Sequence, residues 1–305
     1  MAVELVRATT ADGLRLDGAF AAPSGPQLLP LDSCLFLHGT GSNFYAPGVL
    51  EAFADSARTS GLATLRVNTR GHDGVCSLAA RSGSIRGGAT FEKVCDCAHD
   101  VTAWLDWLTA RGCARVALVG HSIGGVKAVY SQAYAPHASV AAVVGISPPR
   151  FHHAWFQKHP QSERFRADFA RAQELVAAGS GDALLTVTQP MPYITTASGY
   201  LEKYGPEDKY DFVPLLSRLT CSTLIMIGSR SEEANPAFDQ TLAAVAGMAS
   251  ALPHVTACRI DGADINYRGQ LDAPFQRLRA WEVWSTPGTG RTVSQRTRFD
   301  DTPES

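Results

Sequence analysis

Short apolar runs of strand length alternate with patterns of helical period along most of the chain. Six runs are typical of buried strands: residues 34–38, 62–67, 115–120, 140–147, 222–228 and 255–260. Between them, apolar residues recur every three or four positions in residues 91–110, as in a helix with one buried face. This alternation predicts an α/β fold, in which helices flank both faces of a mostly parallel central sheet. A ligand site is then expected beyond the carboxyl ends of the strands.

Residues 149–212 interrupt the alternation with a polar, aromatic-rich stretch that is too long for an ordinary connection. We predict three parts: a core domain of residues 1–148 and 213–284, an inserted lid (cap) at 149–212, and a disordered tail at 285–305. Smaller elements are expected as an antiparallel strand pair in residues 3–21 and helices at 49–59, 122–133, 162–178, 235–250 and 269–284.

Composition limits the possible partners. The net charge of −2 gives no reason to expect binding to nucleic acid or to an anionic membrane. No apolar run approaches the roughly 20 residues of a membrane span, and the first residues lack the pattern of a secretory signal. The seven scattered cysteines are typical of reduced thiols in a cytoplasmic protein. No cysteine–histidine pairs have metal-ligand spacing, so we expect no bound metal. No cofactor is expected either, and the expected partner is a small-molecule substrate.

The stretch Gly120-His121-Ser122-Ile123-Gly124 matches G-x-S-x-G, with a predicted strand before it and a helix after it. A nucleophile in such a strained turn needs small neighbours, because larger side chains at 120 and 124 would collide with the adjoining strand and helix. The alternative is a glycine-rich turn whose serine only caps the helix. We predict that Ser122 is a nucleophile and that His121 lies in its pocket.

A second glycine-containing turn, HGTGSN at residues 38–43, follows the strand at 34–38. An oxyanion needs two backbone N–H donors that are fixed before the charge develops. We predict the amides of Thr40 and Ile123 as these donors, with His38 and Gly39 in the pocket wall. The same turn superficially matches a dinucleotide-binding pattern, but the third glycine of that pattern is missing.

These two motifs and their order resemble the α/β-hydrolase family over roughly residues 30–284. The turn Asn68–His72 is similar to an R-G-H turn of that family, in which the histidine is usually structural. The family's acid lies in a pattern such as G-x-x-D-x-x-x-P. Counted from Gly228, this position falls on Ser231; counted back from Pro236, it falls on Glu232. The resemblance therefore implies Glu232 as the acid, with Glu233 next; a solvated acidic loop is the alternative.

The catalytic histidine that the resemblance implies is missing from its usual position. In IDGADINYRG (260–269), Ile265 stands where the family has its histidine, and no histidine follows His254. Other groups could accept the proton of Ser122: His121, a lid histidine, or a carboxylate (Asp264 or Glu232) with a raised pKa. The lid histidines are His152, His153 and His159.

The lid aromatics either roof an apolar pocket or form the core of the lid; they are Phe151, Trp155, Tyr193, Tyr200, Tyr204 and Tyr210. Of these, Tyr193 is predicted to line the substrate pocket together with Ile265. The resemblance implies a serine hydrolase that attacks a small organic ester, lactone or thioester through an acyl-enzyme on Ser122, with an unusual or degenerate base. The alternative is a non-hydrolytic lyase, dehydratase, cyclase or ligand-binding protein on the same fold.

Overall fold

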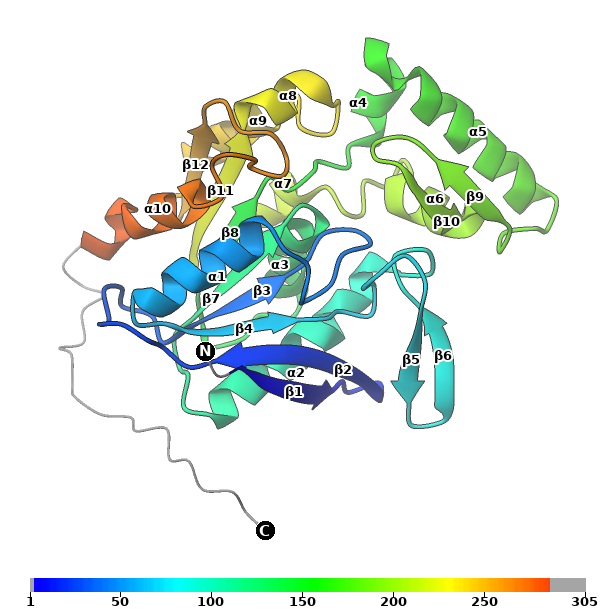
Figure 1. Ribbon diagram of the computed structural model, residues 1–305. Helices are drawn as coiled ribbons and strands as arrows, with labels where there is room; N and C mark the ends of the chain where they lie inside the picture. Colours follow the sequence, from blue (N-terminus) through cyan, green and yellow to red (C-terminus); the bar gives the residue numbers. More distant parts are fainter. Residues whose placement is uncertain (1–2, 286–305) are drawn as a thin grey trace.

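A computed structural model describes residues 3–285, whose main element is a ten-stranded sheet (Figure 1). Its parallel part consists of β3 (Ser33–Leu37), β4 (Ala63–Val67), β7 (Val116–His121), β8 (Val140–Ile146), β11 (Ser222–Gly228) and β12 (Val255–Ile260). These are the six predicted strands, with ends shifted by one residue at most. In space they follow the order β12-β11-β8-β7-β3-β4. The predicted α/β fold is confirmed.

An antiparallel extension completes the sheet beyond β4. It consists of β1 (Glu4–Thr9), β2 (Leu14–Ala21), β5 (Cys76–Ala80) and β6 (Gly83–Gly87). The first two form the strand pair predicted in residues 3–21. The hairpin of β5 and β6 was not predicted, because its sequence contains two glycines and few large apolar residues, so it lacks the pattern of a buried strand.

Helices cover both faces of the sheet, as Figure 1 shows. One face carries α1 (Val49–Thr59) and α10 (Ala273–Arg279); the other carries α2 (Cys97–Ala110), α3 (Ile123–Tyr134) and α9 (Thr241–Ala249). The strands alternate between the two resulting cores: Leu35 and Leu37 pack into one, Cys34 and Phe36 into the other. Burial on both faces explains why the parallel strands are nearly uninterrupted apolar runs.

Three predicted helices are shorter than expected. The helix expected in residues 91–110 becomes an α-helix only at Cys97, after a 3-10 turn at Val94–Asp96. The stretch 235–250 becomes helical only at Thr241, because Asn235 is extended and Pro236 follows it; a separate short helix, α8 (Ser229–Ala234), precedes them. The stretch 269–284 becomes helical only at Ala273, with Pro274 in its first turn, and ends as a 3-10 turn at Glu282–Ser285.

Residues 149–212 lie between β8 and β11 and contain their own small sheet. Their elements are α4 (His153–Lys158), α5 (Glu163–Ala177), β9 (Leu184–Val187), β10 (Tyr193–Thr196) and α6 (Ala197–Tyr204), followed by the short α7 (Phe212–Leu215). Figure 1 shows α4, α5, α6, β9 and β10 grouped at one end of the molecule. We keep the name lid for residues 149–212; that they act as a lid remains a prediction. The predicted tail falls almost entirely outside the described residues. Between residues 3 and 285, no helix is both long enough and apolar enough to span a bilayer.

Candidate active site

Ser122 occupies a sharp turn between β7 and α3. Its backbone has φ 54° and ψ −128°, a conformation that is strained for a residue with a side chain. The neighbouring glycines make the turn possible: a Cβ on Gly120 would lie 2.1 Å from the oxygen of Gly124, and one on Gly124 would lie 2.2 Å from the oxygen of Leu37. The amide of Ser122 donates to the Ile146 oxygen at 2.9 Å, which ties the turn to β8. The geometry is that of a nucleophile elbow.

Gly124→Ala is expected to reduce the free energy of unfolding by about 3 kcal/mol, because its methyl group would collide with the backbone oxygens of Leu37 and His38, where β3 runs into the oxyanion turn. Urea unfolding measures the loss. Gly247→Ala is the matched control: this helical glycine has nothing within 4 Å of a new Cβ. That change should stabilise the protein by roughly 0.5–1 kcal/mol. Equal effects of the two changes would contradict the close packing at the elbow.

The predicted oxyanion turn packs directly on the elbow. A Cβ on Gly39 would lie 3.3 Å from the Cβ of Ser122, and Gly41 takes the left-handed φ of 66° that favours glycine. Thr40 and Ser122 line the same cavity, whereas the side chain of Ile123 is buried beneath the elbow. The two segments that would supply amide donors thus lie next to each other.

His38 does not line the cavity, in contrast to the prediction. Its side chain is buried below the oxyanion turn, where Nδ1 donates to the Gly39 oxygen at 2.8 Å and Nε2 accepts from the Thr69 amide at 3.1 Å. The Thr69 hydroxyl accepts a hydrogen bond from the fully buried Lys127, whose ammonium pairs with Glu92. His38 therefore supports the turn from behind and does not face a substrate.

Protonation of His38 should destabilise the fold. Burial lowers the pKa of His38 to about 4, and the nearby Lys127 charge acts in the same direction. The unfolded chain, with a histidine pKa of about 6.5, takes up this proton first as the pH falls. The stability that neutral His38 contributes to the fold is therefore fully present above pH 6.5. It decreases by roughly 3 kcal/mol as the pH falls from about 6.5 to 4. Urea unfolding of wild type and His38→Asn at pH 7 and pH 4 tests this; an identical drop in both proteins would contradict it.

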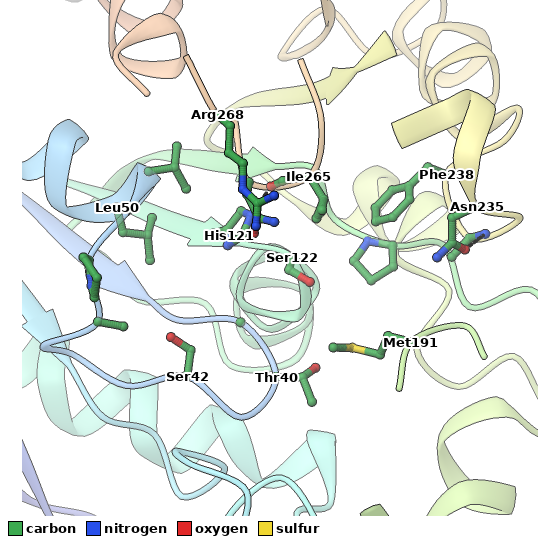
Figure 2. A pocket seen from close by; sticks show the side chains of 18 of the residues that line it. Thr40, Ser42, Leu50, His121, Ser122, Met191, Asn235, Phe238, Ile265 and Arg268 are labelled. Carbon is green, nitrogen blue, oxygen red and sulfur yellow. Dashed lines mark hydrogen bonds between the residues drawn. The ribbon is translucent and has the colours of Figure 1, made fainter. Parts of the chain in front are cut away.

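The cavity in front of Ser122 has a volume of about 920 Å³. Its walls come from the oxyanion turn, the start of α1, residues 190–192 of the lid, residues 235–238 and the loop after β12. In Figure 2 the Ser122 hydroxyl points into the space between Thr40, Met191 and Ile265. Within residues 3–285 this hydroxyl has no hydrogen-bond partner. A substrate could therefore reach it directly.

Ile265 lies in the cavity wall, as predicted from its position after the last strand. Its backbone oxygen accepts a hydrogen bond of 2.7 Å from Nε2 of His121. Burial lowers the pKa of His121, so the imidazole is neutral and carries its proton on Nε2. Among residues 3–285, His121 is the one histidine in the cavity wall, and it is held by the backbone of the loop that carries Ile265.

Glu232, the predicted acid, lies on α8 and is not part of the cavity wall. Its carboxylate is 3.6 Å from the guanidinium of Arg259, and partial burial raises its pKa although Arg259 opposes this shift. The alternative position, Ser231, is buried, and its hydroxyl has no hydrogen-bond partner within residues 3–285. The α8 segment contacts the loop after β12, since the Arg230 amide donates to the Ala263 oxygen at 3.0 Å.

The lid histidines do not reach Ser122. His153 donates from Nδ1 to the Tyr204 oxygen at 2.8 Å, and His159 lies 3.2 Å from Asp239. His152 is 3.8 Å from a carboxylate oxygen of Asp208. None of the three lines the cavity, so the structure offers no lid histidine as a base.

Tyr193, predicted to line the pocket, packs instead inside the lid, where the Lys203 ammonium lies 5.0 Å from its ring. Tyr200, Tyr204 and Tyr210 are buried as well. Of the six lid aromatics, Phe151 is the one that lines the cavity. The lid contributes mainly the turn Pro190–Pro192 to the cavity wall. Tyr200 and Tyr204 pack with Phe165 in the interior of the lid. Tyr210 and Trp155 contact the core domain instead, at Tyr130 and at the Pro236 oxygen.

Several cavity residues were not identified from the sequence. They include Arg66, Asn235, Phe238 and Arg268. Asn235 and Arg268 lie within the two segments that were compared with family patterns, but neither occupies a position to which such a pattern assigns a role; only the folded chain brings the four residues together. Arg268 could have been predicted most easily, since it follows a parallel strand and ligands bind beyond the carboxyl ends of such strands.

The sheet, the strained serine between β7 and α3 and the cavity in front of it define an α/β protein with a nucleophile elbow. The chain belongs to the alpha/beta hydrolase family, whose model matches residues 34–290. No curated protein sequence matches this chain.

Solved structures share the fold at low identity. The chain is similar to Est1E from Butyrivibrio proteoclasticus with bound ferulic acid (15% identity, TM-score 0.61, covering 91% of this chain and 98% of that one). It is also similar to the Pyrococcus furiosus esterase Pf2001 (14%, 0.59, 92% and 90%). A third similar structure is E-2-(acetamidomethylene)succinate hydrolase (21%, 0.55, 93% and 99%).

Proposed function

We propose that the protein is a serine-dependent hydrolase that attacks a small organic ester, lactone or thioester through an acyl-enzyme on Ser122. The observation that carries this proposal is the strained elbow: Ser122 has a positive φ, is packed against the oxyanion turn and faces a cavity. A serine that only capped α3 would not need this geometry, and the Ser122 side chain makes no capping hydrogen bond. Esterases and a hydrolase among the similar structures support the same class.

In the proposed reaction, the Ser122 oxygen attacks the carbonyl carbon and the bond to the leaving oxygen or sulfur breaks, while the serine proton ends on that leaving atom. The leaving alcohol or thiol departs from an ester or thioester and stays attached to the acyl chain of an opened lactone. Water then cleaves the ester on Ser122 to release the acid and restore the hydroxyl. The amides of Thr40 and Ile123 would stabilise the oxyanion in both steps. The base is degenerate in this proposal, because Ile265 stands at the position from which a family histidine would act. Deacylation should suffer most, since water must then be activated without an imidazole. A cytoplasmic location is part of the proposal, consistent with seven unpaired cysteines in the described chain.

The second candidate is a non-hydrolytic protein of the same fold: a lyase, dehydratase, cyclase or ligand-binding protein. It is favoured by one observation: in the part of the chain that the structure describes, His121 is the one histidine of the cavity wall, and its Nε2 donates to the Ile265 oxygen. Such a protein could use the oxyanion turn and the cavity without an acyl-enzyme.

A fluorophosphonate probe separates the two candidates. Wild type should be labelled, and labelling should be lost in Ser122→Ala and kept in Ser42→Ala, which removes another hydroxyl from the same cavity wall. Intact-protein mass spectrometry reads the adduct. If wild type is not labelled at all, or if Ser122→Ala is labelled equally, the serine-hydrolase proposal is wrong and the non-hydrolytic reading stands.

A further inference from the structure

The charges in the cavity wall are all positive. Arg66 and Arg268 line the cavity, no aspartate or glutamate of residues 3–285 does, and His121 is neutral. The start of α1 also lines it, and the N-cap residue Gly48 provides no side chain to accept from the free amides. The rest of the wall is polar and uncharged or apolar, with Pro190, Met191 and Phe238 among its members.

The guanidinium of Arg268 has no bonding partner in the described part of the chain. Within residues 3–285 it makes neither an ion pair nor a hydrogen bond, although Asp264 lies in the same loop. The Asp264 carboxylate instead accepts from the backbone amides of Asn266 and Arg268, at 3.0 and 3.2 Å. In Figure 2 the Arg268 side chain extends from this loop toward His121, over the same cavity as Ser122.

The loop that carries Arg268 is firmly held. Tyr267 is fully buried, and its hydroxyl shares a hydrogen bond of 2.9 Å with Ser147. Its φ of 55° is unusual for a residue with a large side chain, and such strain persists only where the surroundings enforce it. With Tyr267 anchored in the core, its neighbours Ile265 and Arg268 are left facing the cavity.

Arg66 is less available than Arg268. Its guanidinium donates to the Ala46 oxygen and lies 3.7 Å from the half-exposed Glu51, beyond hydrogen-bond length. Burial lowers the pKa of Arg66, so holding its charge has an energetic cost that a bound anion would reduce. Arg66 therefore adds positive potential to the cavity, whereas Arg268 presents a free binding group.

We propose that Arg268 binds a carboxylate on the substrate, so that the preferred substrates are half-esters or related acyl compounds that carry an acidic group in addition to the scissile bond. A planar guanidinium fits a carboxylate with two parallel hydrogen bonds, which fixes orientation as well as affinity. The inference rests on the proposed function only for the scissile bond; the anion site can be tested without turnover.

Calorimetric titration of the Ser122→Ala protein with monomethyl glutarate and with dimethyl glutarate tests the site. The two ligands differ in one carboxylate, and the alanine prevents hydrolysis. At low salt the monoester should bind about tenfold more tightly than the diester. Adding Arg268→Gln should abolish this preference. Arg279→Gln is the control: it removes the same charge from the exposed end of α10, away from the cavity, and should preserve the preference.

Equal binding of the two esters, no measurable binding of the monoester, or a preference that survives Arg268→Gln would each contradict the site. Failure of the proposed function has a different signature, because it would appear as missing fluorophosphonate labelling of wild type.

Discussion

Ile265→His raises the hydrolysis of p-nitrophenyl esters by about a hundredfold, if the loop after β12 is aligned correctly with the family. Ile265 lines the same cavity as Ser122, so an imidazole there can take the serine proton, which a branched alkyl group cannot do. The hydrogen bond of His121 is to the backbone oxygen of residue 265 and is not removed by the change. Initial rates of p-nitrophenol release give the result.

The gain should vanish when Ser122→Ala is added to Ile265→His, since it depends on attack by that oxygen. The acid partner can be identified in the same background. Glu232→Gln should reduce the gain if Glu232 is the acid that orients the imidazole. Ser231→Asp should instead increase the gain if the acid position of the family is residue 231, as the count from Gly228 gives. Rapid hydrolysis by wild type, unaffected by Ile265→His, would show that the alignment of this loop is wrong and that the base lies elsewhere.

Ser122→Ala alone lowers hydrolysis of any substrate that wild type cleaves by at least about a hundredfold, because only oxyanion stabilisation and binding remain. The loss should be smaller than in enzymes with a complete triad, whose serine is activated by a base. Ser42→Ala should lower the rate far less than Ser122→Ala, because the Ser42 hydroxyl lies in the same cavity wall but is not the attacking oxygen. Comparison of kcat/KM for the three proteins provides the measurement. A similar loss in both variants would point to a general disturbance of the cavity.

The sequence predicted the sheet because its strands are buried on both faces and therefore appear as apolar runs. It failed where that signal is weak: in the glycine-containing hairpin of β5 and β6, and in the four-residue strands β9 and β10. Helix starts were displaced by Pro236 and Pro274, whose local effect outweighed the apolar periodicity of the surrounding residues.

The site was predictable where a local motif specifies the geometry. The glycines around Ser122 are needed because backbone lies about 2 Å from any added Cβ, and this requirement is visible in the pattern itself. Contacts between residues far apart in the sequence decide which other side chains face the cavity. His38 follows a strand but turns under the chain to bind Thr69, and Tyr193 packs in the lid core. Arg268 faces the cavity because Tyr267 is anchored on Ser147, a contact between segments 120 residues apart.

Rapid-quench mass spectrometry during reaction with p-nitrophenyl acetate tests the central claim, that Ser122 forms an acyl-enzyme without an efficient base. We predict a burst of p-nitrophenol and one acetyl group per protein on the peptide containing Ser122, with the adduct persisting because deacylation lacks a base. In Ile265→His the adduct should disappear faster. Absence of any adduct, together with turnover that survives Ser122→Ala, would contradict the claim.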